Sequence, residues 1–351
     1  MAAPAHIVVL RFSAMGDVAL LAPILKTAAE ENPGTKITLV TRTKFSGLFK
    51  SIRSVHVFPA DVDSEFKGIS GLLRLTAEIR ALNPDVVIDV HDHLRTRIVR
   101  FLLQFHNIRI IVFNKGRKEK KSFIRLKDKS LLKPLPHTCE RYRLALTEAG
   151  LKISGGFSPP PDQKITGRSL PAFLQTAMDK RLVGIAPFAA HFTKIWSLEK
   201  FTEVIRSFSG EKNIVFFLFG GGKAEIEKLE TLSAGFENCI NIAGKLSLED
   251  ELALMRQLEV MVCVDSSNMH LASLCGTPVL SIWGGTHTGI GFGPLPNSRN
   301  RIIEIPAETL TCRPCSVYGL EKCPRKDHAC MQQISSGTVV SALREMLQQN
   351  S

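Results

Sequence analysis

Short apolar runs alternate with longer amphipathic stretches from the start of the chain. Strands that alternate with helices are typical of βαβ units and a parallel sheet, so the first half predicts such a sheet. Its predicted strands are Ile7–Phe12, Lys36–Val40, Ser54–Phe58, Val86–Val90 and Ile108–Phe113, and its predicted helices are Val18–Glu31, Leu72–Leu82, Leu94–Gln104 and Glu140–Ala149.

The second half repeats this plan and predicts a second doubly wound unit. Ser197 and Ser247 each precede a helical pattern with an acidic residue in its first turn, which predicts two N-caps. Val339–Gln348 predicts a C-terminal helix. The predicted strands are Leu182–Ala186, Asn213–Phe219, Cys239–Ile242, Val260–Val264 and Val279–Trp283.

A chain of 351 residues exceeds the size at which one hydrophobic core keeps growing, which predicts two domains. The polar, Pro-rich segment Ser154–Asp162 reads as the linker between them. We therefore predict an α/β protein with Rossmann-like domains at residues 1–160 and 161–335 and a C-terminal helix at residues 336–351. Two such domains that face a central cleft would turn the carboxyl ends of both sheets inward, where open α/β sheets bind ligands.

The composition is that of a folded protein, with 44% hydrophobic and 22% charged residues. The net charge of +12 arises between Arg95 and Arg143, where 15 Lys and Arg stand against 3 Asp and Glu, a difference of +12. Either a solvated surface or an anionic membrane, glycolipid or nucleic-acid partner would account for this excess. With two Trp, two Tyr and no recognisable nucleic-acid module, we expect no nucleic acid. No targeting signal precedes the first strand, so we expect a cytoplasmic protein.

Three strand ends of the predicted sheets carry candidate chemistry. Gly16 and Asp17 follow the first strand, where Asp17 is either a reactive carboxylate or a first-turn carboxylate that stabilises a helix. Asp265-Ser266-Ser267 follows a later strand and opens a helix whose backbone N–H groups suit a phosphate. Asp265 could instead cap that helix, and His270 could be a buried or capping histidine. Lys194 follows another strand end and would neutralise a leaving phosphate, unless it is a surface lysine.

These segments together resemble the ADP-heptose:lipopolysaccharide heptosyltransferase family. The segment His6–Lys26, with Arg-Phe-Ser-Ala-Met-Gly-Asp in it, is similar to the N-terminal motif of that family. Val264–Pro294 is similar to its C-terminal motif, and Lys194-Ile-Trp196 and Leu246–Glu249 fall in the expected order. The resemblance spans nearly the whole chain.

The resemblance implies a GT-B architecture and an inverting transfer of heptose from ADP-heptose to a hydroxyl of the lipopolysaccharide inner core, on Kdo-lipid A or a heptose. It implies a donor held by the C-terminal domain and an acceptor held by the N-terminal one, with Asp17 as the general base and Lys194 as a contact to the donor phosphate. The remaining donor-binding residues would be Glu249, Asp265, Ser266, Ser267, His270 and Thr286, and the acceptor-binding residues Ser13, Gly16, Arg95 and Arg97.

The sequence departs from the family at Ser267, where a glycine is usual. No strand-flanked Asp-x-Asp motif is present, so we expect no catalytic metal and no cofactor beside the nucleotide sugar. The expected partners are that donor, an anionic glycolipid acceptor and the inner face of the cytoplasmic membrane, which residues 95–143 would contact.

Four cysteines gather near the C-terminus. Such a set in a cytosolic protein predicts a structural zinc site or reduced core thiols. The four are Cys312, Cys315, Cys323 and Cys330.

Two alternatives to the heptosyltransferase remain at this point. One is another transferase, or an epimerase, that uses a different nucleotide sugar on the same architecture. The other is a non-catalytic protein whose basic segment binds anionic lipid or nucleic acid. A carboxylate at a strand end, Asp17, favours an enzyme, whereas the charge excess alone would favour the binding protein.

Overall fold

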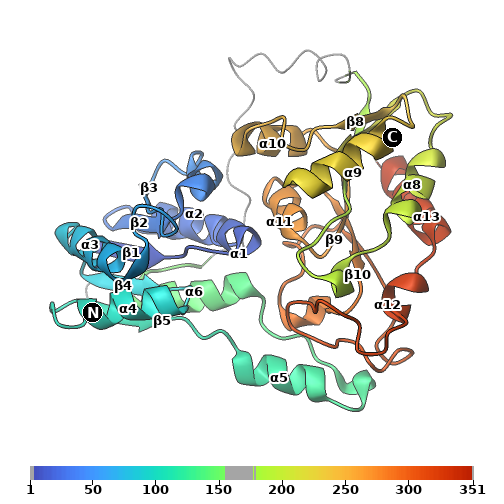
Figure 1. Ribbon diagram of the computed structural model, residues 1–351. Helices are drawn as coiled ribbons and strands as arrows, with labels where there is room; N and C mark the ends of the chain where they lie inside the picture. The colour runs from blue at the N-terminus through green and yellow to red at the C-terminus, as the bar shows by residue number, and fades with distance from the viewer. Residues whose placement is uncertain (1–3, 155–176, 178, 350–351) are drawn as a thin grey trace. The chain divides into compact units, whose positions relative to one another are not determined.

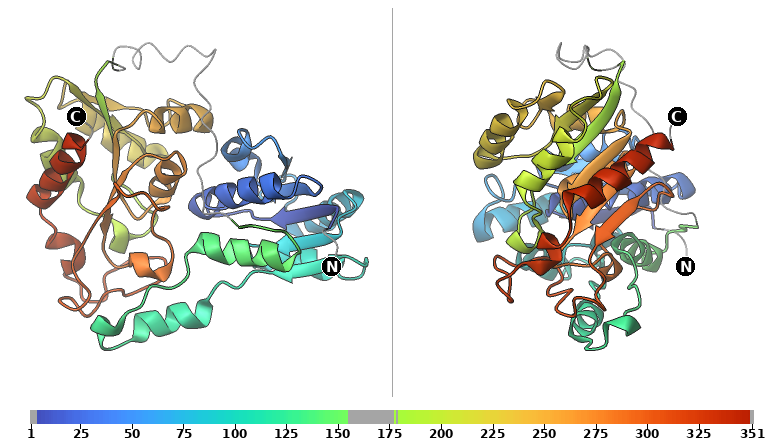
Figure 2. Two further views of the ribbon diagram at one scale, coloured as in Figure 1. Left: turned by 180° about the vertical axis from the view of Figure 1, so that it is seen from behind. Right: turned by 90° about the vertical axis from the view of Figure 1, so that its right-hand side faces the viewer.

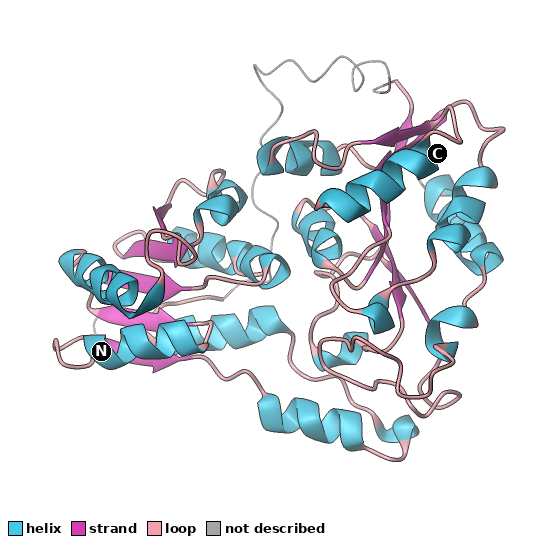
Figure 3. Cartoon of the chain, viewed as in Figure 1, coloured by secondary structure: helices cyan, strands magenta, loops and turns pink. Residues whose placement is uncertain are grey.

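The computed structural model describes residues 4–154, 177 and 179–349, which form two compact α/β units (Figure 1). The first unit comprises residues 1–117 and 136–161, and the second comprises residues 118–135 and 162–351. In each unit the helices flank a sheet of parallel strands (Figure 3). The predicted linker Ser154–Asp162 lies, after Ser154, outside the described residues, and the facing arrangement of the two domains stays a prediction.

The sheet of the first unit has five parallel strands in the order β3-β2-β1-β4-β5. All five predicted strands are confirmed. The strands are β1 (His6–Leu10), β2 (Lys36–Thr41), β3 (Val55–Pro59), β4 (Val86–Asp89) and β5 (Arg109–Val112), and the helices are α1 (Met15–Ala19), α2 (Ala22–Glu31), η1 (Thr43–Phe49), α3 (Gly68–Ala81), α4 (Leu94–Leu103) and α6 (Thr138–Glu148).

One helix prediction in this unit is wrong. Val18–Glu31 was expected as a single helix, but the chain forms α1 and α2 with a break at Leu20 and Leu21. Pro23 stands at the start of α2, and it has no N–H with which to continue a helix that begins at Met15. The break leaves α1 as a short separate helix directly after β1.

The second sheet has six parallel strands in the order β11-β10-β9-β6-β7-β8, the strand order of a Rossmann fold. Ser197 and Ser247 accept backbone hydrogen bonds as the predicted N-caps of α8 and α10. The strands are β6 (Arg181–Ala186), β7 (Ile214–Leu218), β8 (Cys239–Asn241), β9 (Val260–Val264), β10 (Val279–Trp283) and β11 (Arg301–Glu304), and the helices are η3 (Phe192–Lys194), α8 (Leu198–Arg206), α9 (Lys223–Ser233), α10 (Leu248–Met255), α11 (Ser267–Leu274), η4 (Thr288–Ile290), α12 (Ala329–Gln332) and α13 (Ser336–Gln348).

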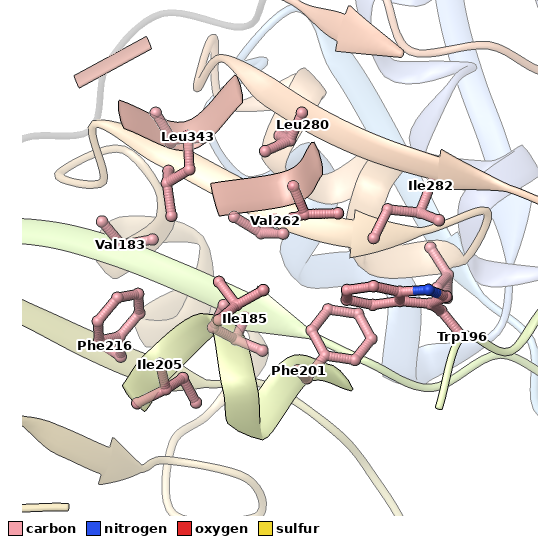
Figure 4. Close-up of a cluster of buried hydrophobic side chains, with 14 of the residues drawn as sticks. Val183, Ile185, Trp196, Phe201, Ile205, Phe216, Val262, Leu280, Ile282 and Leu343 are labelled. Atoms are coloured by element: carbon pink, nitrogen blue, oxygen red, sulfur yellow. The ribbon is translucent and has the colours of Figure 1, made fainter. Parts of the chain in front are cut away.

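A continuous hydrophobic core holds α8 and α13 on one face of this sheet (Figure 4). Trp196 and Phe201 stack edge to face with ring centroids 4.8 Å apart, and both are fully buried. The indole N–H of Trp196 donates to the carbonyl of Ile334, 3.1 Å away. This packing fixes the chain that runs from β6 into α8, and that chain carries Lys194.

Residues 118–135 belong to the second unit, although the sequence placed them in the domain 1–160. They contain most of α5 (Arg117–Arg125) and η2 (Lys129–Leu131), and Figure 2 shows them from behind. The Phe123 and His287 rings lie 5.5 Å apart, and the Leu135 N–H donates to the Gly289 carbonyl. This docking is hard to predict from the sequence, because α5 is mostly charged and buries only Lys120 and Phe123.

Candidate functional site

In the first unit, polar side chains gather where the strand order reverses between β1 and β4. Open α/β sheets bind ligands beyond the carboxyl ends of their strands at such a point. The Asp17 carboxylate pairs with the Arg11 guanidinium at 2.5 Å, and Arg11 also donates to the Val90 carbonyl. The Ser13 hydroxyl lies 3.2 Å from Nε2 of His91. Three predicted residues, Ser13, Gly16 and Asp17, therefore share this point with Arg11 and His91.

Asp17 lies in the first turn of α1, as the helix-stabilising alternative required, but it does not cap that helix. The N-cap is Ala14. The Asp17 carboxylate instead balances the charge of Arg11, which is buried. Its side chain keeps 26% of its surface exposed, so a ligand can reach it.

His91 is a site residue that sequence reasoning did not select. Burial, followed by the charge of Arg11, lowers the pKa of His91 to about 3, so the imidazole is neutral at physiological pH. Its ring packs edge to face on Phe12 and stacks on His93. The feature that could have identified His91 is its position in the loop just after β4, at the carboxyl edge of the sheet.

The predicted acceptor residues Arg95 and Arg97 both form ion pairs. Arg97 pairs with Asp92 at 2.9 Å, and Arg95 pairs with Asp63 at 3.0 Å. Burial opposes the ionisation of Asp92, but its hydrogen bond from Arg97 and the charge of Arg117 outweigh it, and its pKa lies below the usual value. The carboxyl edge of this sheet thus carries a network of paired arginines and aspartates.

In the second unit, three predicted donor residues meet at the reversal point between β6 and β9. Lys194, in η3 after β6, pairs with the Asp265 carboxylate at 3.0 Å. The Thr286 hydroxyl donates to the same carboxylate oxygen at 2.7 Å. The side chains of Lys194 and Asp265 are only 14% and 7% exposed, so the alternative that Lys194 is a surface lysine is wrong.

The loop after β9 leads into α11 as the sequence predicted. Its N-cap is Ser266, so the alternative that Asp265 caps the helix is wrong. Ser267 is the first residue of α11, and His270 is buried within that helix rather than capping it. Ser266 and Ser267 therefore stand beside the Lys194–Asp265 pair in the chain, at a helix N-terminus that favours an anion.

Glu249 lies apart from this group. It stands in the first turn of α10, after β8, and β6 and β7 separate β8 from β9 in the sheet. A donor that reached both Glu249 and Lys194 would have to extend along the carboxyl edge of the sheet. A nucleotide joined to a sugar through a diphosphate has that elongated form.

The profile of glycosyltransferase family 9 (heptosyltransferase) matches residues 72–319. The chain belongs to this family. The resemblance inferred from the sequence is thereby confirmed, and the protein is a glycosyltransferase. The alternative of a non-catalytic binding protein is set aside.

Known members of the family resemble the whole chain. The lipopolysaccharide core heptosyltransferase OpsX of Haemophilus influenzae is 24% identical over 320 residues, which cover 85% of this chain and 84% of the relative. The glycosyl transferase family 9 structure from Veillonella parvula has a TM-score of 0.75 and 19% identity, covering 98% of this chain and 97% of that one. The Escherichia coli ADP-heptose lipopolysaccharide heptosyltransferase II structure has a TM-score of 0.68 and 18% identity, covering 98% and 99%. These likenesses confirm the predicted fold class, two Rossmann-like domains of the GT-B kind.

Arg313 holds the loop that follows β10, and it was not among the residues selected from the sequence. Its side chain is 1% exposed. It donates to the carbonyls of Gly284 at 2.8 Å and Thr286 at 3.0 Å, and to the carboxylate of Glu304 at 2.7 Å. Because Thr286 in turn binds Asp265, Arg313 positions the group that includes Lys194. Arg313 lies between Cys312 and Cys315, and no regular sequence pattern marks it as a site residue.

Replacing Arg313 with lysine is expected to lower the free energy of unfolding by about 1–3 kcal/mol. Lysine keeps the charge but cannot donate to all these oxygens at once, so buried acceptors stay unsatisfied. The Michaelis constant for the donor should rise as well. Urea denaturation and initial rates measure the two effects. Arg325→Lys is the control, because Arg325 pairs with Asp327 in an exposed position and should change neither quantity.

The four C-terminal cysteines are free thiols, and Cys315 packs on the loop that follows β10. The Cys315 thiol donates to the Gly285 carbonyl at 3.4 Å, and a Cβ on Gly285 would come within 2.9 Å of that sulfur. Burial raises the pKa of Cys330 to about 11. Within the described residues no group of three His, Cys, Asp or Glu side chains is placed to hold a metal ion. The zinc site at Cys312, Cys315, Cys323 and Cys330 stays a prediction.

Replacing Cys315 with serine is expected to lower the melting temperature, with a loss of about 1 kcal/mol in stability. Serine is smaller and more polar than cysteine, so it packs less well against Gly285. Differential scanning calorimetry measures the change. Lost activity at unaltered stability would contradict this structural role.

Proposed function

We propose that this glycosyltransferase transfers heptose from ADP-heptose to a hydroxyl of the lipopolysaccharide inner core, with inversion at the anomeric carbon. The buried group of Lys194, Asp265 and Thr286 carries the proposal, because it sets a cation where the sheet of the second unit binds ligands. The relative in Haemophilus influenzae is a lipopolysaccharide core heptosyltransferase, and the Escherichia coli neighbour is an ADP-heptose enzyme. The first name supports the lipopolysaccharide core as the acceptor here, and the second supports ADP-heptose as the donor.

In the proposed reaction the acceptor oxygen forms a bond to the anomeric carbon while the bond from that carbon to the diphosphate breaks. The hydroxyl proton passes to Asp17, and ADP leaves with the charge that Lys194 neutralises. Ser266, Ser267 and His270 would approach the diphosphate, Asp265 and Thr286 the sugar, and Glu249 the ribose. Because Lys194 supplies positive charge, we expect no catalytic metal.

The acceptor would bind at the carboxyl edge of the first sheet. Ser13 and Gly16 lie there beside Asp17, and Arg95 and Arg97 add positive charge from the first turn of α4. Inner-core lipopolysaccharide is anionic, so an arginine-rich edge complements it. We propose in consequence that the protein works at the inner face of the cytoplasmic membrane. Within the described part of the chain, no helix is sufficiently long and apolar to span a bilayer.

A donor panel tests the proposal. ADP-heptose should raise the melting temperature more than ADP-glucose, UDP-N-acetylglucosamine, GDP-mannose or a CMP-sugar. It should also release ADP when an acceptor core that lacks heptose is added, at a rate that a chelator does not change. A larger shift with another nucleotide sugar would favour the alternative transferase or epimerase, and Ser267 in place of the usual glycine is the residue to examine then.

A further inference from the structure

Thr193, the residue directly before Lys194, is tied to two loops of the second unit. It is 1% exposed. Its N–H donates to the Leu320 carbonyl at 3.1 Å, and its hydroxyl accepts a hydrogen bond from the Leu320 N–H at 2.8 Å. Its carbonyl accepts from the Gly285 N–H at 2.8 Å. Thr193 therefore links η3 both to the loop that follows β10 and to residues 316–321, which we call the 316–321 loop.

Two glycines allow the loop that follows β10 to come this close to η3. A Cβ on Gly284 would lie 2.6 Å from the Thr193 carbonyl oxygen, and a Cβ on Gly285 would lie 2.9 Å from the Thr193 Cβ. Both separations are too short for a residue with a Cβ. The Gly285 carbonyl also accepts from the N–H groups of Cys315 and Ser316, at 2.9 Å and 3.3 Å. Thr193, the loop that follows β10 and the start of the 316–321 loop thus meet at Gly285.

The 316–321 loop reaches the side chain of Lys194 at Gly319. A Cβ on Gly319 would lie 2.8 Å from Cδ of Lys194 and 2.7 Å from Cβ of His191. The φ angle of Gly319 is +106°, in the left-handed region that favours glycine. The backbone of Gly319 therefore packs directly on the aliphatic stem of Lys194, whose Nζ pairs with Asp265 at 3.0 Å.

The 316–321 loop is anchored on both sides of Gly319. Before Gly319, the Ser316 hydroxyl accepts a hydrogen bond from the Gly319 N–H at 2.8 Å. After Gly319, a carboxylate oxygen of Glu321 lies 2.6 Å from Nδ1 of His191, the N-cap residue of η3. The loop thus forms an anchored wall against the stem of Lys194.

The stem of a lysine needs such a wall if its charge is to be aimed. It is a flexible chain of four carbons, and the ammonium at its end is a point charge that sets no direction of its own. A charge that stabilises a leaving group is most effective when it is in place before the reaction. Misplacing a reacting group by about 1 Å can lower a rate about 10²-fold.

We propose that Gly319 and Thr193 are positioning residues, which hold Lys194 so that its ammonium stays beside Asp265. Thr193 fixes the backbone of η3, and Gly319 fixes the stem of the lysine. The inference rests on the proposed function for what Lys194 does to the leaving diphosphate, but not for where Lys194 is held.

Gly319→Ala tests the contact with the stem. The added Cβ should displace Lys194 and lower turnover with ADP-heptose about 10²-fold. Gly150→Ala is the matched control, because the φ angle of Gly150 is +103° and its Cβ would come no closer than 3.3 Å to Pro4. Both alanines strain the backbone, so the melting temperature should fall in both variants, whereas turnover should fall only in Gly319→Ala.

Lys194→Ala supplies the background that separates positioning from folding. Without a lysine stem to displace, Gly319→Ala should cause no further loss of turnover, although it should still lower the melting temperature. Initial rates of the wild type, both single variants and the double variant measure this coupling.

Thr193→Val tests the backbone anchor. Valine keeps the shape of threonine but leaves the buried Leu320 N–H without its acceptor, and turnover should fall about tenfold. Thr193→Ser keeps the hydroxyl and should recover most of that turnover.

Acetylation of Lys194 by acetic anhydride provides a measurement that does not depend on sugar transfer. The Lys194 side chain is 14% exposed and paired with Asp265, so it should react slowly in the wild type. Its labelling, followed by peptide mass spectrometry, should be roughly tenfold faster in Gly319→Ala, because a hydrogen bond to a charged group is lost. Labelling in Gly150→Ala should match the wild type.

Three results would overturn the positioning proposal. They are wild-type labelling of Lys194 in Gly319→Ala, an equal loss of turnover in Gly150→Ala, and a further loss of turnover when Gly319→Ala is added to Lys194→Ala. Normal turnover in Lys194→Ala would instead count against the proposed function, and the labelling would still decide whether Gly319 holds Lys194 in place.

Discussion

Asp17→Asn is expected to reduce heptose transfer by about 10²- to 10⁴-fold while ADP-heptose still binds. Asparagine keeps the size of Asp17 and can still accept a hydrogen bond from Arg11, but it cannot take the proton of the acceptor hydroxyl. Turnover is measured by ADP release, and donor affinity by calorimetry. Because a first-turn Asn leaves the short α1 intact, the melting temperature should fall only slightly.

Asp85→Asn is the control for Asp17→Asn, because it should affect stability and not turnover. Asp85 accepts hydrogen bonds from the backbone N–H groups of Ala5 and His6, at the amino end of β1. Its replacement should lower stability and leave turnover unchanged. Turnover near that of the wild type in Asp17→Asn would return Asp17 to a purely electrostatic role beside Arg11.

Lys194→Ala is expected to lower donor turnover by about 10²- to 10³-fold and to raise the Michaelis constant for the donor. The change should also lower stability, because the buried carboxylate of Asp265 loses its cation while the Thr286 hydroxyl still donates to it. Removing one partner of a buried ion pair costs about 3–5 kcal/mol, so urea denaturation should shift together with the kinetics.

Lys200→Ala is the control that separates the loss of stability from the loss of donor turnover. Lys200 donates to the carbonyls of Met331, Gln332 and Ile334, and so ties α8 to the chain before α13. Its loss should lower stability while the Michaelis constant for the donor stays the same. A Lys194→Ala protein that loses stability but uses the donor normally would assign Lys194 to the fold alone.

The strands were predictable because both faces of a parallel sheet are covered, so each strand reads as a continuous apolar run. β11 escaped prediction because it is a short edge strand that starts at Arg301 and ends at Glu304. α5 escaped because its docking depends on Phe123 and His287, which are far apart in the chain.

Some residues of the candidate site were predictable from the sequence, and others were not. The sequence placed Lys194 and Asp265 each after a strand end, and the ends of parallel strands share one edge of the sheet. Thr286 was selected only through the family resemblance. The partnership of Asp17 with Arg11 and the role of Arg313 could not be read in this way. Arg313 comes from a loop that no regular pattern marks, and its acceptors are backbone carbonyls that every residue has.

The path of residues 118–135 bears on how members of this family could exchange their second units. A single crossover in residues 155–176 would leave 118–135 with the first unit, although they pack on the second. Phe123 and Leu135 would then come from one parent, and the partners of His287 and Gly289 would be lost to the second unit of the other parent. Recombinants that inherit 118–135 together with the second unit, through crossovers at 117, at 135 and in residues 155–176, should fold and survive selection more often than those with one crossover.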